Sequence, residues 1–359
     1  MTTMPLSEYI SQIKHLDHAA MSKAEHWLDN LVKPPGSLGK LESIAITLAG
    51  IGGDIFYDAG KRCVIVMCSD NGVVEEGVAA APQSVTHMQT INFTKGITGV
   101  AVLAKQFGAD LIIVDVGINA DVEHPLVINR KIRKSTGNIA RQDAMTREEA
   151  ERAVMVGIET AIEAVKGGYR MLGVGEMGIG NTTSSAAVLC ALTGISAGQA
   201  AGRGAGLTEE AYRNKIHVIQ TALRERAPNP DDPLDVLSKV GGFDLAAMAG
   251  VYIGGAYMGV PVVIDGFISM VAALAAARLS PAVRQYMIAS HKSAEAGYRY
   301  AAEAIEAEPC LHMDMRLGEG SGCPIMFAVI DAACALMRDM GTFEQAGIGE
   351  EYLNALKED

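Results

Sequence analysis

Four short apolar runs, each ending in an acidic residue with a glycine close by, constrain the fold of this 359-residue chain most strongly. The runs cover residues 63–68, 111–114, 170–174 and 262–264, and their acids are Asp70, Asp115, Glu176 and Asp265. Apolar runs that alternate with helical stretches are typical of buried parallel strands in βαβ units. Because ligands bind beyond the carboxyl ends of such strands, we expect the four acids to gather at one edge of the sheet.

The stretches around these runs carry helical patterns. Residues 5–31 place apolar side chains near one helical face, and residues 325–340 predict a largely buried helix. Thr146 and Glu149 have the spacing of a capping box at the start of a helix. Together with the apolar runs, these patterns predict an α/β fold, a Rossmann-like parallel sheet flanked by helices.

The apolar stretch 251–279 raises the question of a membrane span. Pro261 and Asp265 interrupt it, so we expect a buried helix, a strand and a second helix instead. The N-terminal residues lack the basic start and apolar core of a signal peptide. These features favour a cytoplasmic protein without a membrane partner.

Charge and composition exclude several function classes. The net charge of −12 repels nucleic acid and anionic lipid, so we expect neither as a partner. The six cysteines contain no C-x-x-C pair, which favours reduced thiols in the core. The eight histidines show no metal-ligand spacing, so we expect no metal, and nothing in the sequence calls for a cofactor. Without a G-x-S-x-G or G-K-[ST] motif, hydrolase and P-loop functions are also disfavoured.

The densest glycine loop, G-V-G-E-M-G-I-G-N-T-T, spans residues 173–183. It satisfies the G-x-G-x-x-G dinucleotide pattern, but the ribose-binding acid expected about 20 residues later is absent. The loop suits a phosphate, because glycines expose backbone amides and the following helix presents its positive end. It also suits a tight strand-to-helix turn. Glu176 inside the loop is unfavourable for phosphate and well suited to sugar hydroxyls.

Two further glycine loops carry candidate site residues. Residues 202–207 precede Lys215, which is either a solvated surface lysine or a cation for a phosphate. Residues 316–322, R-L-G-E-G-S-G, place Glu319 between two glycines. Because glycines permit close approach, Glu319 is a candidate general base, with an exposed turn glutamate as the alternative. The neighbours Ser290 and His291 cannot face each other as a catalytic nucleophile and base.

These segments, in their order, resemble one family. They include K-P-P-G-S-L-G-K-L-E, V-D-V-G-I, G-V-G-E-M-G-I-G-N-T-T, S-K-V-G-G-F-D-L, V-I-D-G-F-I-S, S-H-K-S-A-E and R-L-G-E-G-S-G, and the likeness spans about residues 5–345. The family is nicotinate-nucleotide:dimethylbenzimidazole phosphoribosyltransferase, which activates the lower-ligand base of cobamides. The resemblance implies a small helical domain from residues 1–30 and 330–359 and a large catalytic α/β domain from 31–329. It also implies a homodimer or a heterodimer with a paralogue.

The resemblance implies that the enzyme moves ribose 5-phosphate from nicotinate mononucleotide to an aromatic base. The general base of the family corresponds to Glu319. The residues expected to bind ribose and phosphate are Glu176, Gly178, Asn181, Thr182, Gly202, Lys215 and Ser290. Those expected to line the base pocket are Ala81, Gln89, Met177 and Leu317.

The sequence departs from the commoner family pattern at Asn71, where the family usually has histidine, and at Ala81, often a serine. It departs again at Cys323 and Pro324, and Met177 stands where leucine is also used. An alanine and a thioether make the pocket more apolar and adaptable. We hypothesise that the enzyme accepts bases other than dimethylbenzimidazole, including phenol or p-cresol. The alternatives are an NAD-dependent oxidoreductase and a non-catalytic nucleotide-binding partner subunit.

Overall fold

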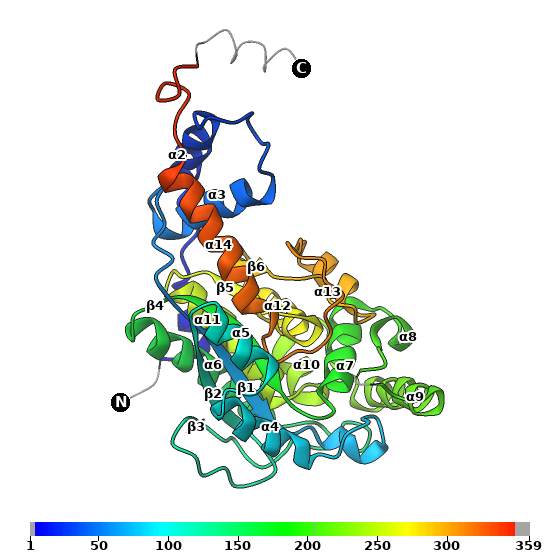
Figure 1. Ribbon diagram of the computed structural model, residues 1–359. Coiled ribbons are helices and arrows are strands. Elements are labelled where there is room, and N and C mark those ends of the chain that lie inside the picture. Colours follow the sequence, from blue (N-terminus) through cyan, green and yellow to red (C-terminus); the bar gives the residue numbers. More distant parts are fainter. Residues whose placement is uncertain (1–3, 205, 349–359) are drawn as a thin grey trace. The chain divides into compact units, whose positions relative to one another are not determined.

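A six-stranded, all-parallel sheet forms the centre of the larger of two compact units, Met1–Lys14 with Lys61–Met326 (Figure 1). The computed structural model describes residues 4–204 and 206–348 of the protein. The strands are β1 (Lys61–Ser69), β2 (Ala109–Gly117), β3 (Val127–Asn129), β4 (Tyr169–Met177), β5 (Val262–Ile264) and β6 (Met287–Ala289), in the order β3-β2-β1-β4-β5-β6. This is the order of a doubly wound sheet whose switch point lies between β1 and β4.

The sheet confirms the predicted α/β fold, since each of the four apolar runs is a strand. Two further strands, β3 and β6, have no apolar run that predicts them; each has three residues and pairs at an edge of the sheet. The glycine loop was also placed too early. Gly173 and Gly175 belong to β4, so the turn itself begins only after Met177.

Helices surround the sheet in the same unit. They are α1 (Leu6–Ser11), α4 (Ser84–Thr94), α5 (Gly99–Gln106), α6 (Arg147–Lys166), α7 (Asn181–Thr193), α8 (Ala197–Ala200), α9 (Glu209–Arg226), α10 (Pro233–Val240), α11 (Phe243–Tyr257), α12 (Phe267–Leu279) and α13 (Tyr298–Ala304), with 3-10 turns η1 (Gly72–Glu76) and η2 (Pro281–Tyr286). The predicted capping box starts α6, where Thr146 and Glu149 bond each other's backbone amides. The connection from β1 to β2 and the connections that lead to β4 and β5 cross the sheet in opposite directions. Because such crossovers are right-handed, α4 and α5 cover one face of the sheet, and α6 and α11 cover the other.

The apolar stretch 251–279 folds as predicted, into the end of α11, then β5 and then α12. Within residues 4–204 and 206–348, no helix is both long enough and apolar enough to cross a membrane. The cysteines form no disulfide, and four of the six are buried.

The second unit comprises His15–Gly60 and Phe327–Asp359, of which 349–359 lie outside the described residues. It contains α2 (His18–Asp29), α3 (Lys40–Gly52) and most of α14 (Gly322–Asp339). Its bounds differ from the expected 1–30 and 330–359. The segment after residue 30 stays with this unit because a buried ion pair, Lys33 Nζ to Glu42 Oε1 at 3.0 Å, ties the K-P-P-G-S-L-G turn to α3. Its status as an independent domain stays a prediction.

The tightest helix contact in the larger unit joins α6 to α11. Gly157 and Gly250 face each other's helices, and a Cβ at either position would overlap backbone atoms of the partner helix. The glycine- and alanine-rich sequence of α11 thus permits two backbones to touch, which fixes α11 against β1, β2 and β4.

We expect Gly250→Ala to lower the free energy of unfolding by about 1–3 kcal/mol or more, because the added methyl must push α6 and α11 apart. Gly198→Ala is the matched control, since nothing lies within 4 Å of a Cβ there. Urea unfolding followed by circular dichroism measures both variants. Equal midpoints for the two would contradict this account of the helix contact.

Candidate active site

A cavity of about 990 Å³ opens at the carboxyl ends of β4 and β5, within the larger unit. Most of the predicted site residues line it. They are Ala81, Gln89, Glu176, Met177, Gly178, Asn181, Thr182, Lys215, Leu317 and Glu319. Gly202 and Ser290 do not line it, but each contacts a residue that does: the carbonyl of Gly202 accepts a hydrogen bond from Lys215 at 3.2 Å, and Ser290 Oγ lies 3.0 Å from His291 Nδ1.

Glu319 is buried, 5% exposed, so it is not the surface turn residue of the alternative reading. Its Oε1 accepts a hydrogen bond from Gln89 Nε2 at 2.7 Å, and its Oε2 accepts one from the amide of Val100 at 3.2 Å. Gln89 is oriented in turn, since its own oxygen accepts from Asn92 Nδ2 at 3.2 Å. The Glu319 carboxylate is therefore held in one orientation by donors on α4 and α5.

Glu176 lies at the end of β4 and shares a donor with a second buried carboxylate. The Nδ2 atom of Asn181, the first residue of α7, donates to Glu176 Oε2 at 2.5 Å and to Asp244 Oδ2 at 2.9 Å. Burial raises the pKa of Glu176 to about 8 and that of Asp244 to about 6, against the bonds from Asn181. Burial therefore favours the protonated form of Glu176, and a cationic ligand would favour its ionised form.

A different part of the cavity carries a positive charge. Lys215 on α9 is fully buried, contrary to the composition-based expectation of a surface lysine. Its Nζ donates to Thr182 Oγ1 at 2.9 Å and to the Gly202 carbonyl, which leaves its third N–H without an acceptor among the described residues. Burial lowers the pKa of Lys215 to about 8, and the charge of Glu295 opposes this. With the N-terminus of α7 close by, this region suits a bound phosphate.

The wall beside Glu319 is apolar. Val78, Ala79, Ala80, Ala81, Val85, Met177 and Leu317 line it. Gln89, the polar residue of this wall, is already bonded to Glu319 and Asn92. An aromatic ring fits such a surface better than a polar group does.

Not every residue that the sequence pointed to reaches the cavity. Asp70 follows β1 and accepts a hydrogen bond from the amide of Asn119. Asp115, near the end of β2, accepts bonds from the amides of Gly117 and Ile118 and pairs with Lys131. Of the four strand-end acids, Glu176 and Asp265 line the cavity. Asn71 is buried behind the turn at Gly178 and accepts a hydrogen bond from Ser184.

Cys323 is buried beside the carbonyls of Val174 and Val263. Of the departures from the commoner family pattern, Ala81 and Met177 are therefore the ones that face the site.

Sequence reasoning did not assign His291, Arg203 or Glu295 to the site, although all three line the cavity. His291 was considered only as a partner of Ser290, with which it does make contact. The other two carried no spacing signal, because the cavity brings them together from segments more than 80 residues apart.

The buried carboxyls make stability depend on pH. Glu176, Asp265 and Asp244 have pKa values of about 8, 7 and 6 in the folded protein, against about 4 when unfolded. Between pH 4 and 8 these three groups bind more protons in the folded state than in the unfolded state, so their contribution to stability falls as pH rises through this window.

We expect the melting temperature of the substrate-free protein to drop from pH 6.0 to pH 8.5, and Glu176→Gln to reduce that drop. Glu303→Gln, at an exposed position on α13, is the control and should keep the wild-type drop. Differential scanning calorimetry at both pH values checks this, and an unchanged drop in Glu176→Gln would rule out the assignment.

Known proteins resemble this chain along nearly its whole length. A family model described as phosphoribosyltransferase matches residues 13–348. The nicotinate-nucleotide–dimethylbenzimidazole phosphoribosyltransferase of Clostridium perfringens is 52% identical over 354 residues, covering 99% of this chain and 98% of that protein. The enzyme of the same name from Ruminiclostridium cellulolyticum is 51% identical, covering 97% of this chain and 99% of that protein.

A solved structure shares the fold. The crystal structure of the corresponding phosphoribosyltransferase from Thermus thermophilus superposes with a TM-score of 0.88 at 38% identity, over 93% of this chain and 99% of that one. These relatives give no support to the oxidoreductase alternative. In addition, the glycine turn follows β4 and not β1, where a dinucleotide fingerprint belongs. The chain belongs to the nicotinate-nucleotide–dimethylbenzimidazole phosphoribosyltransferase family.

Proposed function

We propose that this phosphoribosyltransferase moves the 5-phosphoribosyl group of nicotinate mononucleotide to an aromatic base, 5,6-dimethylbenzimidazole or a related compound. The products are nicotinate and an α-riboside 5'-phosphate, the lower-ligand precursor of a cobamide. The observation that carries the proposal is the Glu319 carboxylate, buried and held by Gln89 and Val100 beside an apolar wall. A base of this kind is what an incoming N–H nucleophile requires.

The reaction balances with a single proton acceptor. The unprotonated ring nitrogen of the base attacks the anomeric carbon, while Glu319 takes the proton from the other nitrogen. The bond from the anomeric carbon to the pyridinium nitrogen breaks, its electron pair returns to the ring, and nicotinate leaves with a neutral ring nitrogen. Attack opposite the leaving group converts the β-nucleotide into the α-product. No group has to protonate the leaving ring.

Glu176 has a separate role in this scheme. The nucleotide carries a positive pyridinium ring, and the transition state places positive charge on the ribose. Burial raises the pKa of this carboxyl, and the positive charge of the bound nucleotide opposes that shift, so Glu176 releases its proton to solvent and its carboxylate then stabilises the cation. Asn181 keeps its side chain in place through the 2.5 Å hydrogen bond.

The phosphate is assigned to the Lys215 end of the cavity, where Thr182, Gly178 and the start of α7 also lie. Holding the phosphate there fixes the distance between the anomeric carbon and the base, and positioning of this kind supplies much of the rate enhancement in two-substrate reactions. We further assign the enzyme to the cytoplasm and propose a homodimer, or a heterodimer with a paralogue. The exposed apolar side chains Met88, Ile97 and Val102 support a protein interface.

We expect Glu319→Gln to lower kcat by about 10²–10⁴-fold, because the amide cannot accept the proton, while nucleotide affinity changes little. Product formation is followed by chromatography, and the affinity for nicotinate mononucleotide by calorimetry. The control is Glu303→Gln, which leaves the cavity untouched. Turnover at the wild-type rate in Glu319→Gln would exclude Glu319 as the base.

The identity of the base is a separate hypothesis, that phenols are accepted as well. Residue 81 offers no hydroxyl, and Gln89 is occupied, so the wall has little to recognise the second nitrogen of a benzimidazole. Glu319 would take a phenolic O–H proton equally well.

With dimethylbenzimidazole, phenol and p-cresol at equal concentrations, we expect both N- and O-ribosides among the products. We also expect Ala81→Ser to shift the mixture toward the N-riboside. Mass spectrometry quantifies the ratio, and a strong preference of the wild-type enzyme for dimethylbenzimidazole would refute the hypothesis.

A further inference from the structure

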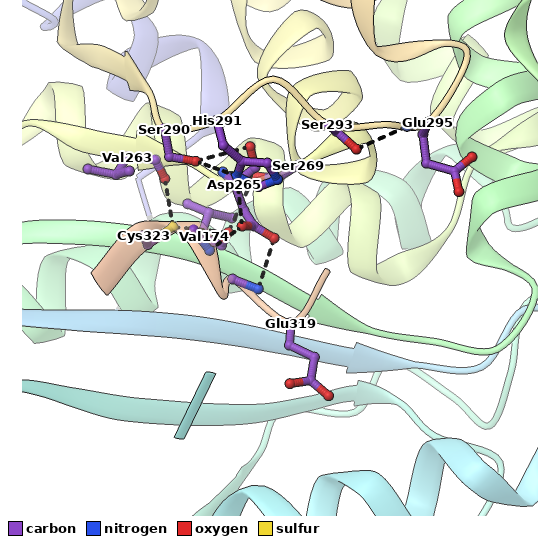
Figure 2. A network of polar contacts seen from close by, with 12 residues as sticks. Val174, Val263, Asp265, Ser269, Ser290, His291, Ser293, Glu295, Glu319 and Cys323 are labelled. Carbon is purple, nitrogen blue, oxygen red and sulfur yellow. Dashed lines mark hydrogen bonds and ion pairs between the residues drawn. The ribbon is translucent and has the colours of Figure 1, made fainter. Parts of the chain in front are cut away.

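Asp265, which directly follows β5, holds the glycine loop that carries Glu319 (Figure 2). Its Oδ2 accepts a hydrogen bond from the amide of Gly320 at 3.1 Å, and its Oδ1 accepts one from the amide of Gly322 at 2.7 Å. Gly322 is the first residue of α14, so the carboxylate also lies at the positive end of that helix. One side chain therefore fixes the backbone at two points directly after Glu319.

The loop needs this support because its backbone is strained. Gly318, Glu319 and Gly320 have φ angles of 85°, 64° and 88°, three consecutive residues in the left-handed region. For the two glycines this conformation is easy, but for Glu319 it costs roughly 1–2 kcal/mol. Without fixed acceptors for its amides, the loop can relax to another conformation and carry the Glu319 carboxylate away from Gln89 and Val100.

Asp265 lines the cavity, and its contacts hold it against the loop. Both of its oxygens are occupied by the loop amides, and Figure 2 shows the Glu319 side chain directed away from it. His291 Nδ1 lies 3.8 Å from Oδ1, and Ser290 Oγ donates to the Asp265 carbonyl at 3.3 Å. The Asp265 amide in turn donates to Ser269 Oγ at 3.2 Å, so the residue is anchored on both sides of its own backbone.

We propose that Asp265 is a positioning residue for the general base, because its two oxygens lock the Gly320 and Gly322 amides and thereby keep the Glu319 carboxylate facing the cavity. This inference rests on the proposed role of Glu319. Asp265 itself exchanges no proton with either substrate.

The Asp265→Asn variant tests whether the two acceptor oxygens of Asp265 matter, and not only the volume that its side chain fills. Asparagine has the same size, but its single oxygen can accept only one of the two amides, and its NH2 group meets the other donor to donor. The variant should fold, because the buried charge is costly: burial raises the pKa of Asp265 to about 7, against the bonds from Gly322, Gly266 and Gly320. Asp265→Ser, which removes both acceptors and leaves room for water, replaces it if the asparagine variant does not fold.

The test is a double-mutant cycle with Glu319→Gln, measuring kcat, KM and nucleotide affinity for the full-length enzyme. We expect Asp265→Asn alone to lower kcat at least tenfold with nucleotide affinity within about twofold. In the Glu319→Gln background it should have no further effect, because the group that it positions is gone. If turnover of Glu319→Gln falls below detection, the cycle is run with Glu319→Asp, where we expect the effect of Asp265→Asn to be smaller than in the wild type.

Asp115→Asn is the matched control. Asp115 is also a buried acid near a strand end whose Oδ1 accepts two backbone amides, those of Gly117 and Ile118, and its Oδ2 pairs with Lys131 at 3.0 Å; the loop that follows carries none of the residues assigned to the site. Any decrease in kcat that this variant causes should persist unchanged in the Glu319→Gln background.

The outcomes separate the two ideas. Wild-type turnover in Glu319→Gln overturns the proposed base and the positioning role with it. If Glu319→Gln has a low kcat, and Asp265→Asn lowers that kcat by the same factor as it lowers the kcat of the wild type, the positioning role alone is overturned.

Discussion

The parallel pairing of β1 with β4 is the contact on which the site depends. From Arg62 onward these strands stay in register up to the last residue of β4, with Met67 opposite Glu176 and Cys68 opposite Met177. Because the chain leaves β1 and β4 in different directions, a crevice opens where they end. The turn at Gly178 then packs so closely on the end of β1 that a Cβ would overlap the carbonyl of Ser69. The start of α7, and with it Asn181 and Thr182, is placed by this pairing.

Glu176, Asp244, Asp265 and Glu319 are buried carboxyls in and beside the cavity, and none of them forms an ion pair with a lysine or arginine among the described residues. Amides satisfy them instead: Asn181 for Glu176 and Asp244, backbone N–H groups for Asp265, and Gln89 with Val100 for Glu319. Acids solvated by neutral donors keep their attraction for a cation that enters later, because no internal ion pair has to be broken. The buried Lys215 is a cation that can attract an anion in the same way. A mononucleotide with a cationic ring and an anionic phosphate matches both halves.

The sequence allowed the long central strands and the strand-end acids to be predicted, because burial on both faces produces unbroken apolar runs. It did not allow β3 and β6 to be predicted, since a three-residue strand owes its existence to its neighbour and leaves no periodicity. Composition left two readings of Lys215 open, a surface lysine and a cation for a phosphate, for a related reason. Its partner Thr182 lies 33 residues away, and only the packed helices show that the lysine is buried. The contacts of Asp265 span 55 and 57 residues, so its hold on the loop had no local signal.

Backbone geometry explains why glycine stands on both sides of Glu319. Gly175 has no side chain, and a Cβ there would overlap the carbonyl of Glu319, so the loop lies directly on β4. At that distance the backbone must turn through left-handed conformations to direct Glu319 toward α4 and α5. The strain is offset by the bonds that loop amides make to Glu176 and Asp265. Glu176 and Asp265 thus have two functions. They line the cavity, and they hold Glu319 in a conformation that it would not adopt by itself.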